Sequence, residues 1–237
     1  MNQALSRSNL IKTFFQRYTP LQVAIHIYGW SALVRLIVDF YTHHLTANPI
    51  QAMEQRTGRH ALTLLVLSIA CTPLNNFFGW RELLKRRRAL GLYAFMYASI
   101  HLIIFMDLDY GFAWSLLLQT VAEKPYIIYG LTTFLLLIPL AFTSFDIWKK
   151  RLGKNWKRLH QLIYFILPLA AYHYILSKKG DLFKLQGDLI RPLIYALIIL
   201  ILLTFRIPPV RRAIASLRDR ILLLFKKRTL QPEADSS

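Results

Sequence analysis

Six apolar runs, each near the length that crosses a lipid bilayer, constrain the fold of this chain more than any other feature. They lie at about 21–40, 60–80, 90–106, 126–145, 159–177 and 192–205. A helix needs about 20 apolar residues to cross a hydrocarbon layer of roughly 30 Å. Because backbone in lipid must satisfy its own hydrogen bonds, such runs fold as helices. We therefore predict an all-α fold, a polytopic membrane bundle of six transmembrane helices without an internal repeat.

Basic residues in the gaps between these runs indicate the orientation of the bundle. The alternate segments 1–20, 80–89, 146–159 and 206–237 hold 22 Lys and Arg, whereas 41–59, 107–126 and 177–191 hold 7. Positive residues gather on the cytoplasmic side of membrane proteins. This alternation predicts that both termini are cytoplasmic.

The same pattern predicts three parts of the chain. Residues 1–20 form a cytoplasmic amino-terminal segment, 21–205 the transmembrane domain, and 206–237 a basic cytoplasmic tail. The tail has the pattern of an amphipathic basic helix on the membrane surface. No early apolar core with a small-residue cleavage site follows the first residues, so we expect no cleaved signal peptide.

Composition agrees with a multi-pass membrane protein and excludes several other classes. Apolar residues make up 55% of the 237 residues, and the formal net charge is +18. Because the basic residues occupy the gaps and form no single stripe, we expect the lipid bilayer and not nucleic acid as the partner. The single cysteine, Cys71, cannot form an intrachain disulfide or supply a thiolate cluster for iron–sulfur or zinc.

Histidines inside the apolar runs are the candidate cofactor ligands. An imidazole in lipid is costly, and neutral imidazole is a common axial ligand of haem iron. Counted from the cytoplasmic side, His101 lies about 18 Å deep in the third run and His173 about 20 Å deep in the fifth. We predict that these two residues hold one haem between two helices.

His160, at the cytoplasmic edge of the fifth run, is the third candidate ligand of haem iron. A second haem there would need a partner at the same depth, and His26 in the first run is the nearest match. The sequence leaves that second haem open. The alternative for all of these residues is a hydrogen-bonded packing role in a haem-free membrane scaffold or transporter.

Several motifs resemble those of one protein family. The segments are TGRHAL (57–62), TPL (72–74), RRRALGLYAFMYASIHL (86–102), KPYIIYG (124–130), PLAFTS (139–144) and LGKNWKRLHQLIYFILPLAAYHY (152–174). Together they resemble the MsrQ family, also called YedZ, within the ferric-reductase-like transmembrane family. The resemblance covers about residues 20–205 in order.

The resemblance implies a haem-binding subunit of the bacterial methionine sulfoxide reductase system in the inner membrane. It implies haem b and FMN as cofactors, and electrons that pass from the quinone pool to a periplasmic molybdopterin-containing MsrP-like reductase. The histidines of the family fall on His101, His160 and His173. Larger members of the superfamily carry a fourth histidine, and this chain has Arg87 or Arg88 near that place.

The expected activity is electron transfer and not the reduction of methionine sulfoxide itself. The chain shows no ligand set for molybdenum and no catalytic thiol. No nucleotide-binding motif follows the membrane part, which leaves quinol or a separate flavin reductase as the electron donor. The alternative is a b-type cytochrome subunit that serves a different membrane reductase.

Overall fold

The computed structural model describes residues 18–178, 180–181 and 186–229, and most of them are helical. The elements are α2 (Pro20–Tyr41), α3 (Pro49–Phe78), α4 (Glu82–Ile103), the π-helix η1 (Ile104–Asp109), α5 (Trp114–Glu123), α6 (Pro125–Phe142), α7 (Asp146–Leu152), α8 (Lys154–His160), α9 (Ile163–Leu176), the two-residue strands β1 (Gly180–Asp181) and β2 (Gln186–Gly187), α10 (Ile190–Thr204) and α11 (Pro208–Thr229). The two strands pair antiparallel.

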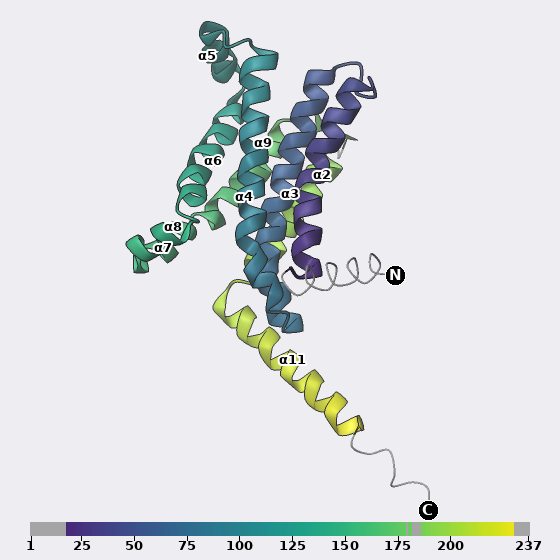
Figure 1. The fold of residues 1–237 in the computed structure, drawn as a ribbon, viewed down its shortest axis with the longest axis vertical. Coiled ribbons are helices and arrows are strands. Elements are labelled where there is room, and N and C mark those ends of the chain that lie inside the picture. The colour runs from purple at the N-terminus through teal and green to yellow at the C-terminus, as the bar shows by residue number, and fades with distance from the viewer. Residues whose placement is uncertain (1–17, 179, 182–185, 230–237) are drawn as a thin grey trace, which may run out of the picture.

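The long helices form the predicted membrane bundle. Five helical segments in the described part of the chain are long and apolar enough to cross a membrane, and α10 is a shorter apolar helix. Figure 1 shows α2, α3 and α4 side by side, with α6 beyond α4 and α9 behind. The fold class is therefore confirmed. The first residues of α2 and the helix α11 lie at the same end of the bundle, as an even number of crossings requires.

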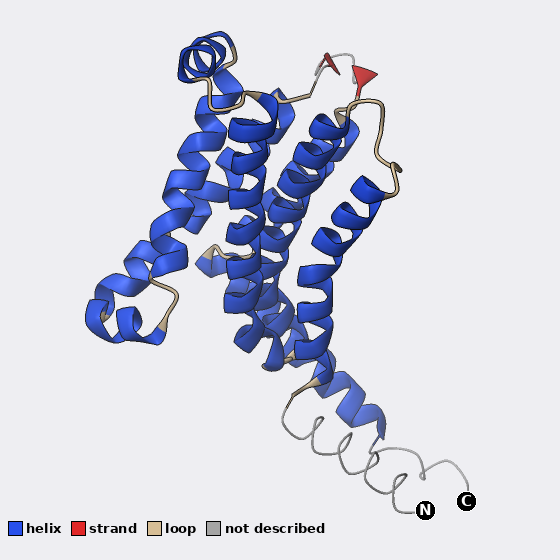
Figure 2. Ribbon diagram, turned by 45° about the horizontal axis from the view of Figure 1, so that its top comes forward, coloured by secondary structure: helices blue, strands red, loops and turns tan. Residues whose placement is uncertain are grey.

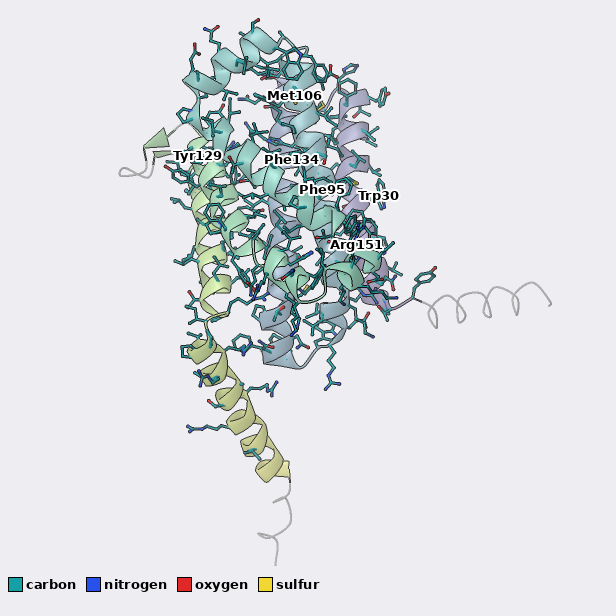
Figure 3. All side chains as sticks on the ribbon, turned by 90° about the vertical axis from the view of Figure 1, so that its left-hand side faces the viewer. Trp30, Phe95, Met106, Tyr129, Phe134 and Arg151 are labelled. Atoms are coloured by element: carbon teal, nitrogen blue, oxygen red, sulfur yellow. The ribbon has the colours of Figure 1, made fainter. Side chains whose placement is uncertain are left out.

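The core lies where α3, α4, α6, α9 and α10 meet. Leu64 of α3, Ala94 of α4 and Ile166 of α9 have no exposed surface at all. Phe95 of α4 stacks on Phe134 of α6 with ring centroids 5.7 Å apart, and Figure 3 shows the two rings next to each other. Large apolar side chains elsewhere face outward, as a surface in contact with lipid requires.

Capping residues explain where two of the long helices begin. The Thr19 side chain accepts a hydrogen bond from the Gln22 amide at the start of α2, and Asn48 does the same for Gln51 at the start of α3. In each case a proline occupies the first helical turn, where its missing N–H costs nothing.

Three loops of the prediction contain helix. The polar segment 41–59 was expected to lie outside the second span, but α3 begins at Pro49 and extends that span by about three turns. The segment 107–126 contains α5, and the basic segment 146–159 contains α7 and most of α8. Figure 2 shows α5 and the strands at one end of the bundle, with α7 and α8 at the other.

The tail and the termini are only partly described. A helix occupies Pro208–Thr229, as the pattern predicts, and Figure 1 shows it leading away from the bundle. Its contact with a membrane surface stays a prediction, as does the division into three parts. Residues 1–17 of the amino-terminal segment and 230–237 of the tail lie outside the described residues.

Candidate functional site

His101 lies in the last turn of α4, directly before the π-helix η1. Its Nδ1 is 2.9 Å from the backbone carbonyl oxygen of Glu54 on α3. A carbonyl only accepts, so Nδ1 carries the proton and Nε2 keeps its lone pair. The ring packs against Gly58, where a Cβ atom would lie 3.1 Å from it.

His173, in the last turn of α9, has the same surroundings. Its Nδ1 is 2.7 Å from the backbone carbonyl oxygen of Tyr126 in the first turn of α6. The Nδ1–H therefore donates to that carbonyl, and Nε2 is again left as the free acceptor. The ring lies on Gly130, where a Cβ atom would approach Cε1 to 2.6 Å.

The two arrangements are copies of one local design. In both, the histidine follows its carbonyl partner by 47 residues, and the glycine follows that partner by four. The pair α3–α4 thus repeats as α6–α9. The sequence alone predicted no internal repeat, and the likeness that the structure adds is this matching pair of contacts. Each histidine contacts a backbone carbonyl, which any residue can supply, and a glycine. The two segments can therefore make the same contacts without similar sequences.

The two arrangements bring the rings of His101 and His173 next to each other. The ring centroids of His101 and His173 are 6.3 Å apart, with an interplanar angle of 75°. With metal–nitrogen bonds of about 2 Å, imidazoles on opposite sides of one metal ion have ring centres roughly 6 Å apart. Both rings are partly buried between helices. The separation, the burial and the free Nε2 atoms therefore fit the two axial ligands of one iron ion.

The donor set favours a metal that brings its own equatorial ligands. The described residues contain no group of three or more His, Cys, Asp or Glu that could hold a metal ion. Structural zinc takes four protein ligands, whereas haem iron needs protein ligands only on its axis. Two histidines alone thus fit haem.

His160 is not part of this pair. It ends α8, near the opposite end of the bundle. Its Nε2 lies 3.1 Å from the Thr143 hydroxyl, and its ring stacks on Trp156 at 4.1 Å between centroids. Trp156 in turn donates to the Thr143 carbonyl. The described structure pairs His160 with no other histidine.

The repeat shows which residue occupies the place of the fourth histidine. His160 precedes His173 by thirteen residues, and Arg88 precedes His101 by the same number. Arg88 is exposed; its guanidinium is 3.4 Å from Asp146 and lies over the Phe145 ring. By this spacing Arg88, an exposed residue next to Arg87, falls at the fourth position.

The other histidines in apolar runs have packing partners. His26 on α2 forms a 2.8 Å hydrogen bond with the Tyr93 hydroxyl of α4, so it does not meet His160. His60 on α3 packs edge-on against Tyr97, with centroids 4.5 Å apart. Both contacts connect neighbouring helices within the bundle.

Four residues of the site were missed from the sequence: Glu54, Gly58, Tyr126 and Gly130. Glu54 and Gly58 lie in the helical extension that the prediction assigned to a loop. The one signal for that extension was the Asn48–Pro49 pair, which is typical of a helix start.

The fold and the site define a class, and sequence comparison agrees with it. The chain is a multi-pass membrane protein with two facing histidines on separate helices. A sequence profile described as "Ferric reductase like transmembrane component" matches residues 57–171. This part of the chain is therefore similar to the ferric-reductase-like transmembrane proteins.

Individual relatives narrow the class. A protein of Xanthomonas campestris pv. campestris (strain 8004), named "Protein-methionine-sulfoxide reductase heme-binding subunit MsrQ", is 43% identical over 163 residues, which are 69% of this chain and 72% of that protein. A protein of the same name from Xanthomonas axonopodis pv. citri (strain 306) is 41% identical over 69% of this chain and 72% of its own length. One from Herminiimonas arsenicoxydans is 39% identical over 73% of this chain and 78% of its own. The chain belongs to the MsrQ family, as its motifs predicted.

Proposed function

We propose that this chain binds haem b between His101 and His173 and serves as the electron-transfer subunit of a methionine sulfoxide reductase system. The observation that carries the proposal is the facing pair of imidazoles, 6.3 Å apart, with each Nδ1 bonded to a backbone carbonyl. The names of the relatives, which describe haem-binding subunits, support the same cofactor.

Contacts within the chain orient both ligand rings. The carbonyls of Glu54 and Tyr126 fix the tautomer and the direction of each ring, and a hydrogen bond of this kind makes the imidazole a stronger ligand. Gly58 and Gly130 let a neighbouring helix approach each ring. When bound, haem b supplies an iron ion that accepts and releases one electron.

The direction of transfer follows the predicted orientation. His101 lies in the last turn of α4, which leads through η1 to α5. Figure 1 shows α5 at one end of the bundle, and the basic loops assign that end to the periplasmic side. Electrons from the quinone pool would leave there for a periplasmic molybdopterin-containing MsrP-like reductase. His160 lies near the cytoplasmic entry side. FMN is part of the proposal because of the family resemblance, and no residues are assigned to it. A second haem remains open.

Substitution of one ligand tests the haem site. We expect His101→Ala to lose the low-spin b-type band in reduced-minus-oxidised spectra while the protein still inserts in the membrane. His44→Ala is the matched control, because His44 is exposed and its ring bonds the nearby Thr42 hydroxyl, away from the histidine pair. Full haem content in His101→Ala would refute the ligand assignment.

Electron transfer needs a separate experiment with the purified chain. We expect a quinol to reduce the haem band, and an MsrP-like reductase with methionine sulfoxide to reoxidise it. A band that quinol reduces but that only another reductase reoxidises would favour the general cytochrome-subunit alternative.

A further inference from the structure

A second polar cluster lies in the half of the bundle away from the histidine pair. It is formed by the last turns of α3, the start of α4 and Arg206, the second residue after α10. The two cations in it are Arg87 of α4 and Arg206 after α10. The backbone of Arg87 and the guanidinium of Arg206 contact adjacent residues of α3: the Ser68 hydroxyl donates to the Arg87 backbone carbonyl at 3.0 Å, and Arg206 donates to the Ile69 carbonyl at 2.9 Å.

Arg206 is held in place by neutral groups only. One guanidinium nitrogen donates to the Ile69 carbonyl, and the other lies 3.1 Å from the Tyr164 hydroxyl of α9. Its Nε is buried and has no hydrogen-bond partner. Burial lowers the pKa of the Arg206 guanidinium from its ordinary value, and the nearby charge of Arg87 acts in the same direction. The Arg206 guanidinium is therefore partly desolvated, and Arg87 lies close enough for its charge to act on it.

Arg87 differs from its neighbours on α4 because it has no carboxylate partner among the described residues. Arg86 pairs with Glu82 and Arg88 with Asp146. The Nε of Arg87 is buried without a partner, and among the described residues no Asp or Glu pairs with it or with Arg206. A buried charge is costly unless an opposite charge and hydrogen bonds compensate it. The two arginines together thus lack an anion.

The adjoining face of α3 adds neutral hydrogen-bonding groups. Thr72 follows Ser68 by four residues and Asn75 follows Thr72 by three, so all three share one side of the helix. The Thr72 hydroxyl oxygen and the Asn75 Oδ1 are buried, and neither has a partner in the structure. Guanidinium groups with a hydroxyl and an amide are the groups that bind phosphate and carboxylate oxygens.

We propose that Arg87 and Arg206, with Thr72 and Asn75, form an oxyanion site in the inner half of the bundle. The ligand is the phosphate or carboxylate group of a larger molecule that enters between α3, α4 and α10. The oxyanion site rests on the proposed function only for its position near the electron-entry side. The buried, unpartnered Nε atoms of both arginines support it independently of the haem site.

Chemical analysis of the purified, haem-loaded protein tests the site and identifies the source of the oxyanion. Flavin, phospholipid phosphorus and haem are measured per chain in the wild type, in Arg87→Met and in Arg206→Met. Arg88→Met is the matched control, because its guanidinium is exposed and paired with Asp146. Loss of flavin, of phosphorus or of haem in both variants, but not in the control, would assign the oxyanion to a nucleotide, a lipid headgroup or a haem propionate.

Titration covers the case of a ligand lost on purification. Thermal unfolding is followed with added FMN, with inorganic phosphate, and in phosphatidylcholine nanodiscs with or without phosphatidylglycerol. A ligand that binds only the native state raises its melting temperature. We expect at least one probe to stabilise the wild type, with a half-saturating concentration about tenfold higher in Arg87→Met, as the loss of a charge-assisted hydrogen bond predicts.

Arg206→Lys is a second variant in case Arg206→Met fails to fold. Lysine keeps the positive charge but cannot form the two parallel hydrogen bonds of a guanidinium, so it should bind the oxyanion more weakly than the wild type. Equal bound contents and equal stabilisation in the wild type, both Met variants and Arg88→Met would overturn the oxyanion site. An intact b-type band in the same samples would show that the haem proposal stands independently.

Discussion

Replacement of Gly130 by alanine tests how closely the haem-ligand geometry depends on helix packing. A Cβ atom there would lie 2.6 Å from Cε1, 2.8 Å from Nδ1 and 3.2 Å from Nε2 of His173. The obstacle is the imidazole itself, held by its 2.7 Å hydrogen bond to the Tyr126 carbonyl. The ring or α6 must therefore move, and either movement weakens that hydrogen bond and turns Nε2 away from His101.

The size of the effect follows from the cost of overpacking. Extra methyl groups in a well-packed interior cost about 1–3 kcal/mol. If that strain is relieved when the haem-binding conformation is lost, haem affinity falls by roughly 5- to 150-fold. Gly58→Ala should act in the same direction but more weakly, because its Cβ would lie 3.1 Å from the His101 ring.

The assay is haem titration of the apoprotein in detergent, with the spectrum of the bound state recorded at saturation. Gly91→Ala is the matched control, since its Cβ would meet only the Ser68 hydroxyl at 3.8 Å and alanine favours the helix. We expect Gly91→Ala to bind haem like the wild type. Equal haem affinity in Gly130→Ala and Gly91→Ala would refute the reasoning.

Three further substitutions test the remaining contacts. His160→Ala should leave the b-type band of the outer pair in place, because His160 contacts neither ligand; loss of that band would contradict the assignment. Tyr97→Phe should lower the free energy of unfolding by about 1–3 kcal/mol, measured by thermal unfolding, because its buried hydroxyl donates to the Gly29 carbonyl at 2.7 Å. Arg56→Gln removes the ion pair with Asp39, which is partly exposed, so it should cost no more than about 1 kcal/mol and less at high salt.

The histidine pair could be predicted because it depends on two quantities that the sequence contains: where each span begins, and how far along the span each histidine lies. Span boundaries follow from apolar runs and basic gaps, and depth follows from the rise of a helix. His101 and His173 could thus be matched across two spans without any structure. The same counting placed His160 at the cytoplasmic edge with His26 as its nearest match, and the structure has His160 at the end of α8 and His26 bonded to Tyr93 instead.

The supporting contacts could not be predicted because they have no side-chain signature. The partner of His101 is the carbonyl of Glu54, and that of His173 is the carbonyl of Tyr126. Any residue supplies a carbonyl, so an acidic and an aromatic residue serve equally in the two copies. The beginning of α3 was not predicted because its residues are polar. Glu54 and Arg56 are typical of a loop between spans, yet both lie in the helix.

Arg206 shows a second limit of the sequence pattern. Topology rules count it as a cytoplasmic positive charge like any other in the tail. The structure instead turns it back onto the Ile69 carbonyl within the bundle. Its direction depends on the end of α10 and on Tyr164 of α9, which only the packed helices bring together.

The most direct test of the account is the dithionite-reduced minus air-oxidised spectrum of the purified chain, with haem quantified per polypeptide. The facing pair of His101 and His173 predicts a sharp low-spin b-type band with at least one haem per chain. A colourless protein after expression with ample haem would contradict the central claim and favour a haem-free scaffold or transporter.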